Sequence, residues 1–244
     1  MKNFLWIFAH YFRRTLLDPM WALPQIGLPL AFVIIIVMIN TGHIEGEALA
    51  RVATTNATVL MVLFQFIGGA SVAAWIYEDF RSANRWRLHA APVSRNTYIL
   101  ALAAASCLAT IAQGAAVVGV SAAFFGARWD SVWVLAAAML LSSLTAHMLA
   151  MLMLPLTKTK RAAEGLAMAS AFLMYAFAGF GFPGINLDFL PVLPTPLGMG
   201  VNAIFYSGVI LDDMGAAARN LLMMLAIAAA LVAGIVALGR RRPF

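Results

Sequence analysis

The sequence predicts an all-α, polytopic membrane protein with six transmembrane helices, and two observations carry this prediction. Hydrophobic residues make up 63% of the 244 residues and charged residues only 11%, whereas soluble domains carry about 25% charged residues. A soluble fold of this size has too little interior to hide so much apolar surface. In addition, the apolar residues fall into six runs, each close to the length of about 20 residues that a helix needs to cross a bilayer.

Residues 1–18 are predicted to form an amphipathic helix that lies in the membrane interface, with its cations toward the lipid headgroups. Its apolar face holds Leu5, Phe8, Phe12 and Leu16, and its polar side holds Asn3, His10, Arg13 and Arg14. The helix is expected to end at Asp18-Pro19, because the residue before a proline avoids the helical region. A frayed N-terminal extension of the first span is the alternative interpretation.

The six predicted spans cover roughly residues 21–40, 53–77, 96–125, 132–156, 165–182 and 216–238. Pro24 and Pro29 should disturb the first span. The small residues Gly68-Gly69-Ala70-Ser71 should let the second span approach its neighbours closely. Between the fifth and sixth spans, residues 183–213 are apolar but interrupted by prolines and glycines. We expect short re-entrant or extracellular helices there, since residues 198–211 are too few to span.

The orientation follows from the distribution of basic residues. Thirteen of the 16 lysines and arginines lie in the N-terminal segment, in residues 78–95, in the loop 157–164 and in the C-terminal tail. Cytoplasmic loops carry this excess in multi-pass proteins. We therefore expect a cell-membrane protein with both termini cytoplasmic. Because the basic residues sit in short clusters between apolar runs, the net charge of +6 is not attributed to a nucleic-acid partner.

Several kinds of catalytic chemistry are not expected of this chain. The sequence has no nucleotide-binding loop of the form G-x-x-x-x-G-K-[ST] and no metal-ligand spacing such as H-E-x-x-H. Its single cysteine, Cys107, excludes an internal disulfide. We thus predict no catalytic residue, metal or cofactor on the chain itself. His147 is the one histidine within a predicted span; either a structural histidine bonded to a neighbouring helix or a functional group fits it.

The most charged segment is residues 78–95, which separates the second and third apolar runs. It holds two acids, four arginines and Trp86. Two interpretations are open from the residues alone: a docking element for a soluble partner, with Trp86 as an interface residue, or a solvated positive-inside loop with Trp86 among the headgroups.

The order of residues in this segment is specific. An acid, Glu78, ends the second span, followed by the small pair Ser82-Ala83, then Leu88, then Ala90-Ala91-Pro92-Val93-Ser94 at the start of the third span. With the proline-rich stretch 193–197, this resembles the permease subunits of ABC-2 type transporters, in particular bacterial multidrug, antibiotic and peptide exporters. Those permeases usually have Gly-Thr where this chain has Ser82-Ala83.

The resemblance covers nearly the whole chain as a single transmembrane domain, residues 1–244, and implies its partners. These are two separate ATP-binding subunits, which bind ATP and Mg, and a second permease chain in a homodimer or paralogous heterodimer. Segment 78–95 would be the coupling segment that docks on the ATP-binding subunit. The docking residues implied are Glu78, Arg81, Arg85, Trp86, Arg87, Leu88 and Pro92.

The resemblance also implies export of a hydrophobic or amphipathic substrate, such as a drug, antibiotic, peptide or lipid, along a path formed mainly by the second and fifth spans. Candidate path residues are Met61, Phe64, Gln65, Phe172 and Tyr175, because methionine and aromatic surfaces adapt to varied apolar ligands. Ordinary helix packing is the other interpretation of these residues.

Three alternatives belong to other classes of protein. A membrane accessory or immunity protein would bind a partner without transporting anything. An intramembrane enzyme acting on lipid would need a clustered polar set, and His147, Gln65 and Gln113 are sparse in the sequence. A proton-coupled carrier would need ionisable groups within its spans, and no Asp, Glu, Lys or Arg lies clearly mid-span.

Overall fold

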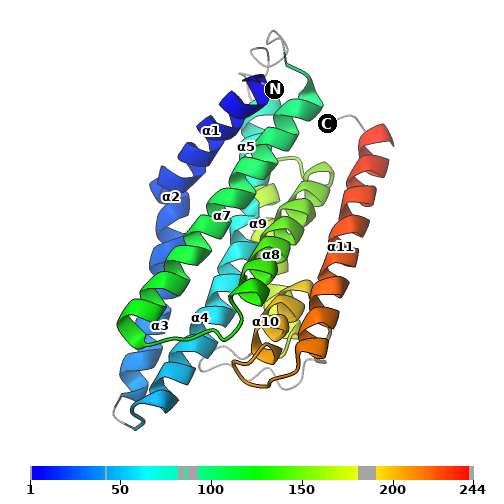
Figure 1. Ribbon diagram of the computed structural model, residues 1–244. Helices are drawn as coiled ribbons and strands as arrows, with labels where there is room; N and C mark the ends of the chain where they lie inside the picture. The colour runs from blue at the N-terminus through cyan, green and yellow to red at the C-terminus, as the bar shows by residue number, and fades with distance from the viewer. Residues whose placement is uncertain (1, 42, 82–85, 87–92, 181–190, 242–244) are drawn as a thin grey trace.

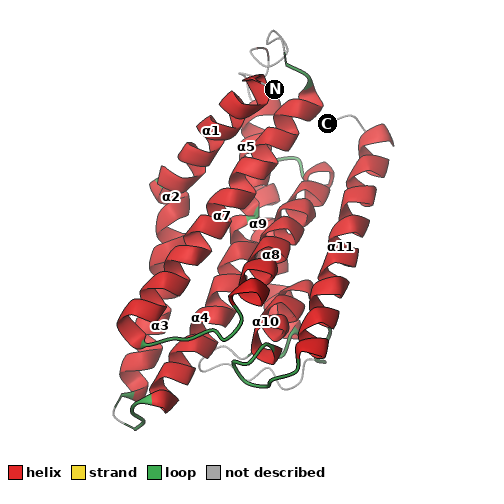
Figure 2. Cartoon of the chain, viewed as in Figure 1, coloured by secondary structure: helices red, strands yellow, loops and turns green. Residues whose placement is uncertain are grey.

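The structure is a computed structural model that describes residues 2–41, 43–81, 86, 93–180 and 191–241. Within these residues the regular elements are helices, and the only β-type pairing is an isolated bridge between Ser207 and Asp212 (Figure 2). The long helices run side by side, and the first helix begins at the same end of the bundle at which the last one finishes (Figure 1). The predicted all-α membrane protein is confirmed at this level.

The N-terminal region forms α1 (Lys2–Leu17), α2 (Pro19–Ala22), the π-helical turn η1 (Leu23–Gly27) and α3 (Leu28–Asn40). The predicted break at Asp18-Pro19 is confirmed. Asp18 has an extended backbone, and its carboxylate accepts a hydrogen bond from Met20 N as the N-cap of α2. Pro29 lies at the start of α3 and Pro24 lies within the wide turn η1, and both lack the N–H group that a regular α-helix needs. That turn places Gln25 inside the bundle.

One side of α1 packs against the bundle and the other side faces outward. Its buried face is Ile7, Tyr11 and Thr15, whereas Leu5 is 57% exposed. Phe8 and Phe12 are half-buried against the core. Arg14, expected to face the headgroups, lies over the ring of Trp75. The helical period finds an apolar stripe correctly, but it cannot tell which half of a wide stripe packs against the protein.

The centre of the bundle is the pair α4 (Glu47–Gly68) and α5 (Ala70–Arg81), whose most apolar stretch is 94% buried. Gly69 joins the two helices, and a Cβ atom on it would lie 2.7 Å from the carbonyl oxygen of Ala146. A Cβ atom on Gly68 would lie 2.6 Å from Cγ2 of Thr110. The close helix contact predicted for this cluster of small residues is therefore confirmed.

The remaining helices of the described ranges are α7 (Arg95–Phe125), α8 (Val132–Met153), the 3-10 turn η2 (Leu154–Leu156), α9 (Lys160–Phe177), α10 (Pro196–Tyr206) and α11 (Met214–Arg241). The side chains of Ser94, Ser131, Thr159 and Thr195 cap α7, α8, α9 and α10. Gly126, with φ at 66°, ends α7, because a left-handed residue there is usually glycine. The predicted third, fourth and last spans agree with these bounds.

Five described helical stretches are long and apolar enough to cross a membrane: Pro19–Asn40, Glu47–Phe80, Arg95–Phe125, Val132–Leu156 and Met214–Ala237. The chain is thus a multi-pass membrane protein. α9 begins at Lys160, not at residue 165 as predicted, and so Lys160, Arg161 and Glu164 lie in its first turns rather than in a loop. The reason is that the Thr159 hydroxyl caps Ala162 N, and the three charged residues are good helix formers.

The segment between α9 and α11 contains one helix among its described residues, α10, with 11 residues. Leu197, Val201 and Ile204 are fully buried and anchor this helix in the bundle. The Thr195 hydroxyl donates to the carbonyl oxygen of Met174 and so joins the start of α10 to α9. Residues 183–190 of the expected re-entrant segment lie outside the described residues.

Candidate functional site

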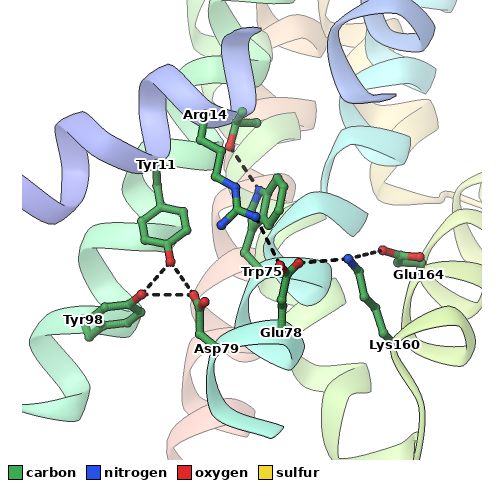
Figure 3. Close-up of polar contacts among 9 residues, drawn as sticks. Tyr11, Arg14, Trp75, Glu78, Asp79, Tyr98, Lys160 and Glu164 are labelled. Carbon is green, nitrogen blue, oxygen red and sulfur yellow. Dashed lines mark hydrogen bonds and ion pairs between the residues drawn. The ribbon is translucent and has the colours of Figure 1, made fainter. Parts of the chain in front are cut away.

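Glu78, in the last turns of α5, joins three helices through its carboxylate (Figure 3). Its Oε1 accepts a hydrogen bond from Nη2 of Arg14 in α1 at 3.2 Å. Its Oε2 accepts one from Nζ of Lys160 in α9 at 3.0 Å. Lys160 also lies 4.0 Å from Oε1 of Glu164, one turn further along α9. Each carboxylate oxygen of Glu78 therefore holds a cation from a different helix.

Trp75, one turn before Glu78 in α5, also contacts Arg14. The guanidinium carbon of Arg14 lies 3.9 Å from the centre of the indole ring, and the indole Nε1 donates to Oγ1 of Thr15 at 3.2 Å. A cation over an aromatic face is attracted to the ring. Arg14 is thereby oriented by a carboxylate on one side and an aromatic ring on the other.

Asp79, the next residue of α5, makes a second contact with α1 and also contacts α7. Its Oδ2 accepts hydrogen bonds from the hydroxyl of Tyr11 at 2.5 Å and from that of Tyr98 at 3.0 Å. The two hydroxyls lie 2.6 Å apart. Burial, reinforced by the Asp79 carboxylate, raises the pKa of the Tyr11 phenol above its ordinary value. Tyr11 consequently remains a neutral donor at physiological pH.

We call Tyr11, Arg14, Glu78, Asp79, Tyr98 and Lys160 the terminal network. Tyr77 extends it, since its hydroxyl donates to the backbone carbonyl of Lys158 before α9. The last turns of α5 thus contact α1, α7 and α9 immediately before the charged segment 82–92. Among the described residues no group of three metal-ligating side chains comes together.

The predicted docking residues are only partly described. Glu78 belongs to the terminal network, and Trp86 is 61% exposed. Arg81 is the last residue of α5, with its side chain outside the described part. Arg85, Arg87, Leu88 and Pro92 lie outside the described residues. Docking on an ATP-binding subunit therefore stays a prediction.

The predicted path residues divide between the two helices that carry them. On α4, Met61, Phe64 and Gln65 face the interior of the bundle. On α9, Tyr175 is buried and Phe172 is 44% exposed. The three α4 residues line one internal pocket that is too narrow to hold a water molecule, and its other lining residues are Gln25, Thr110, Gln113, Gly114 and Val117. Phe172 and Tyr175 do not line it, and a substrate path through all five residues stays a prediction.

Three amide side chains meet at this internal pocket: Gln25 from η1, Gln65 from α4 and Gln113 from α7. We call them the glutamine cluster. All three are at most 3% exposed, and neither the oxygen nor the nitrogen of any of the three amides has a hydrogen-bond partner among the described residues. His147 lies elsewhere on α8, with its Nδ1 2.7 Å from the carbonyl oxygen of Ser143 in its own helix.

Sequence reasoning missed most of the terminal network. It singled out Glu78 but not Asp79, Tyr11, Tyr98 or the contact of Lys160. One available signal was the second acid beside Glu78 at the end of a long apolar run, since an acid there needs partners when it is partly buried.

Comparison with known proteins identifies the family. Residues 40–237 match the family described as ABC-2 family transporter protein, which is more than half of the chain. The match includes all of α4 to α10 and most of α11. No curated protein matches the sequence. Together with the membrane-spanning helices, the family match establishes that the chain belongs to the ABC-2 family of transporter proteins.

Proposed function

We propose that the chain is the transmembrane subunit of an ATP-driven exporter, which moves a hydrophobic or amphipathic substrate out of the cell with two separate ATP-binding subunits. ABC-2 membrane subunits associate with ATP-binding subunits as a family. The observation that carries the proposal is the terminal network, because Glu78 and Asp79 connect the end of α5 to α1, α7 and α9 where the predicted docking segment begins.

The proposed topology has six crossings, with α9 as the fifth in chain order. α9 has 18 residues, or roughly 27 Å of helix at 1.5 Å per residue, which is close to the thickness of a bilayer core. Helix α1 begins and helix α11 ends at the same end of the bundle (Figure 1), and an even number of crossings agrees with this. The excess of basic residues supports a cytoplasmic position for that end.

The mechanism is a rigid-body transition. ATP binding closes the two ATP-binding subunits, and each moves the docked segment 82–92 of one permease chain. Through the terminal network, α1, α5, α7 and α9 move with it. The energy comes from the difference in nucleotide affinity between the two arrangements. A second copy or a paralogue of this chain completes the path.

The docking step is tested with the double variant Arg85→Glu, Trp86→Ala, compared with Arg128→Glu at the opposite end of the bundle. Reversal of charge and loss of the indole should reduce recovery of the ATP-binding subunit in a pull-down, while Arg128→Glu should behave as the unaltered chain. Thermal unfolding in detergent checks that both variants remain folded. Unchanged co-purification of the double variant would contradict docking through this segment.

ATPase measurements test whether ATP is hydrolysed by separate subunits and not by this chain. The purified chain alone should hydrolyse ATP no faster than a mock preparation, and the reconstituted complex should show turnover that substrate stimulates. Clear turnover by the chain alone would overturn the need for separate ATP-binding subunits.

A further inference from the structure

A pocket of about 480 Å³ lies beside the terminal network, between the α1–α2 junction, α5 and α9. It differs in character from the internal pocket of the glutamine cluster, because both charged and apolar side chains line it. Its lining residues are Arg14, Asp18, Met20, Trp21, Trp75, Glu78, Lys160, Arg161, Glu164 and Met168.

The pocket lies at the boundary between water and the bilayer core. Its α2 wall is the start of the first membrane-spanning stretch, Pro19–Asn40. Met20 of this wall is 79% exposed, and the neighbouring Leu17 and Leu23 are also exposed. Large apolar side chains exposed at this level are solvated by acyl chains, while the ionised side chains of the same pocket need the headgroup layer. A ligand that fills the pocket therefore has a polar and an apolar part.

The charges of the pocket are unequally partnered. Arg14 and Lys160 share Glu78, and Lys160 lies near Glu164. The Asp18 carboxylate accepts a hydrogen bond from Met20 N and thereby caps α2. Arg161 lines the pocket, but no carboxylate of the described residues lies within ion-pair distance of it. Arg161 acts on the Glu164 carboxylate only over a longer distance, so its guanidinium donors are available for an external anion.

The same position favours an anion for a second reason. Arg161 is the second residue of α9, and the first backbone N–H groups of a helix have no partner within it. The Thr159 side chain satisfies only Ala162 N. An oxyanion at this helix start gains both the guanidinium and the positive end of an 18-residue helix.

We propose that this pocket binds the headgroup of a phospholipid from the adjoining leaflet. The phosphate lies at Arg161 and the start of α9, and the acyl chains run along Met20 and Leu23. Arginine suits the phosphate because its planar donor fork matches phosphate oxygens. A lipid bound here would join α2 to α9 beside the contact that Glu78 makes between α1 and α9. This inference goes beyond the transport function and does not depend on the direction of transport.

Native mass spectrometry of the full chain in detergent tests the proposal with added phosphatidylglycerol. Arg161→Ala should weaken the tightest lipid-binding step at least tenfold. The matched control is Arg13→Ala, which removes an exposed cation of α1 outside the pocket and should leave that step unchanged. Equal lipid binding by both variants would overturn the proposal.

Two further arms identify the source of the phosphate and the role of charge. Arg161→Lys keeps a cation at the start of α9 and should retain most of the lipid affinity, so that a loss as large as that of Arg161→Ala would point to a packing defect and contradict the phosphate contact. Inorganic phosphate at millimolar concentration should not displace the lipid. Displacement by phosphate with no contribution from acyl chains would assign the site to a soluble anion and overturn the lipid assignment.

Discussion

The terminal network and the glutamine cluster are both polar sites in an apolar bundle, but their polar atoms are partnered in opposite ways. Both carboxylate oxygens of Glu78 hold a cation, and Asp79 accepts two hydroxyl donors. The amides of Gln25, Gln65 and Gln113 have no partner among the described residues. Both sites include a residue of the central α4–α5 pair: Gln65 lies 13 residues before Glu78, or roughly 20 Å along a helix.

The difference distinguishes a fixed contact from an unsatisfied one. A buried polar group without a hydrogen bond costs about 1–3 kcal/mol, and such groups are rare in native structures. The contacts of the terminal network stabilise the arrangement in which α1, α5, α7 and α9 lie together. The unpartnered amides of the glutamine cluster are stabilised only when the helices shift so that the amides find hydrogen-bond partners, or when a hydrogen-bonding group enters. Conformational change is therefore expected to cost least around Gln65.

The largest effect is expected for Glu78→Ala, which leaves Arg14 and Lys160 without their shared carboxylate. Because these groups are partly exposed, we expect a loss of about 2–3 kcal/mol in the free energy of unfolding, within the range for hydrogen bonds to charged groups. Thermal unfolding in detergent measures it. The control is Glu47→Ala, which breaks the exposed pair with Arg51 and should change stability by about 0.5 kcal/mol or less. Similar losses in both variants would mean that the terminal network is no more than a surface ion pair.

A smaller loss is expected for Tyr11→Phe, which removes one of the two donors to Asp79. We expect about 1.5 kcal/mol, because the carboxylate keeps the hydroxyl of Tyr98. Tyr206→Phe is the matched control, since no hydrogen bond of the Tyr206 hydroxyl occurs among the described residues. The same measurement applies to both variants. A Tyr11→Phe protein as stable as the Tyr206→Phe protein would remove Asp79 from the set of fixed contacts.

The smallest effect, and one of opposite sign, is expected for Gln65→Leu. It removes two unpartnered amide atoms and keeps most of the side-chain volume, so stability should stay unchanged or rise by about 1 kcal/mol. Thr110→Val is the informative comparison in the same pocket, because the Thr110 hydroxyl is hydrogen-bonded to Ser143. It should lose about 1 kcal/mol. A clear loss of stability for Gln65→Leu would show that the amides have partners in the membrane.

Those features of the fold that depend on local sequence could be predicted. Asp18-Pro19 ends a helix because of the proline, and Gly68-Gly69 permits close packing because neither residue has a Cβ atom. The start of α9 was misplaced, because a run with Lys160, Arg161 and Glu164 has the composition of a loop at a membrane face. Capping by Thr159 was the local signal for the earlier start.

The contacts of the terminal network could not be predicted, because they join residues far apart in the chain. Arg14 and Glu78 are separated by 64 positions, and Lys160 and Glu78 by 82. Helical periodicity assigns a residue to a face of its own helix but does not say which helix lies opposite. The glutamines are a similar case: Gln65 and Gln113 are isolated in the sequence, and only the packing of α4 against α7 brings them into one pocket.

The π-turn η1 has a consequence for how the first span can move. A wide turn holds one more residue than an α-helical turn does, and one residue corresponds to a rotation of roughly 100° about the helix axis. If this extra residue passed into α2 or α3, Gln25 would turn out of the glutamine cluster while the backbone stayed helical. Such a step at Leu23–Gly27 would exchange one face of the first span for another without unfolding the helix.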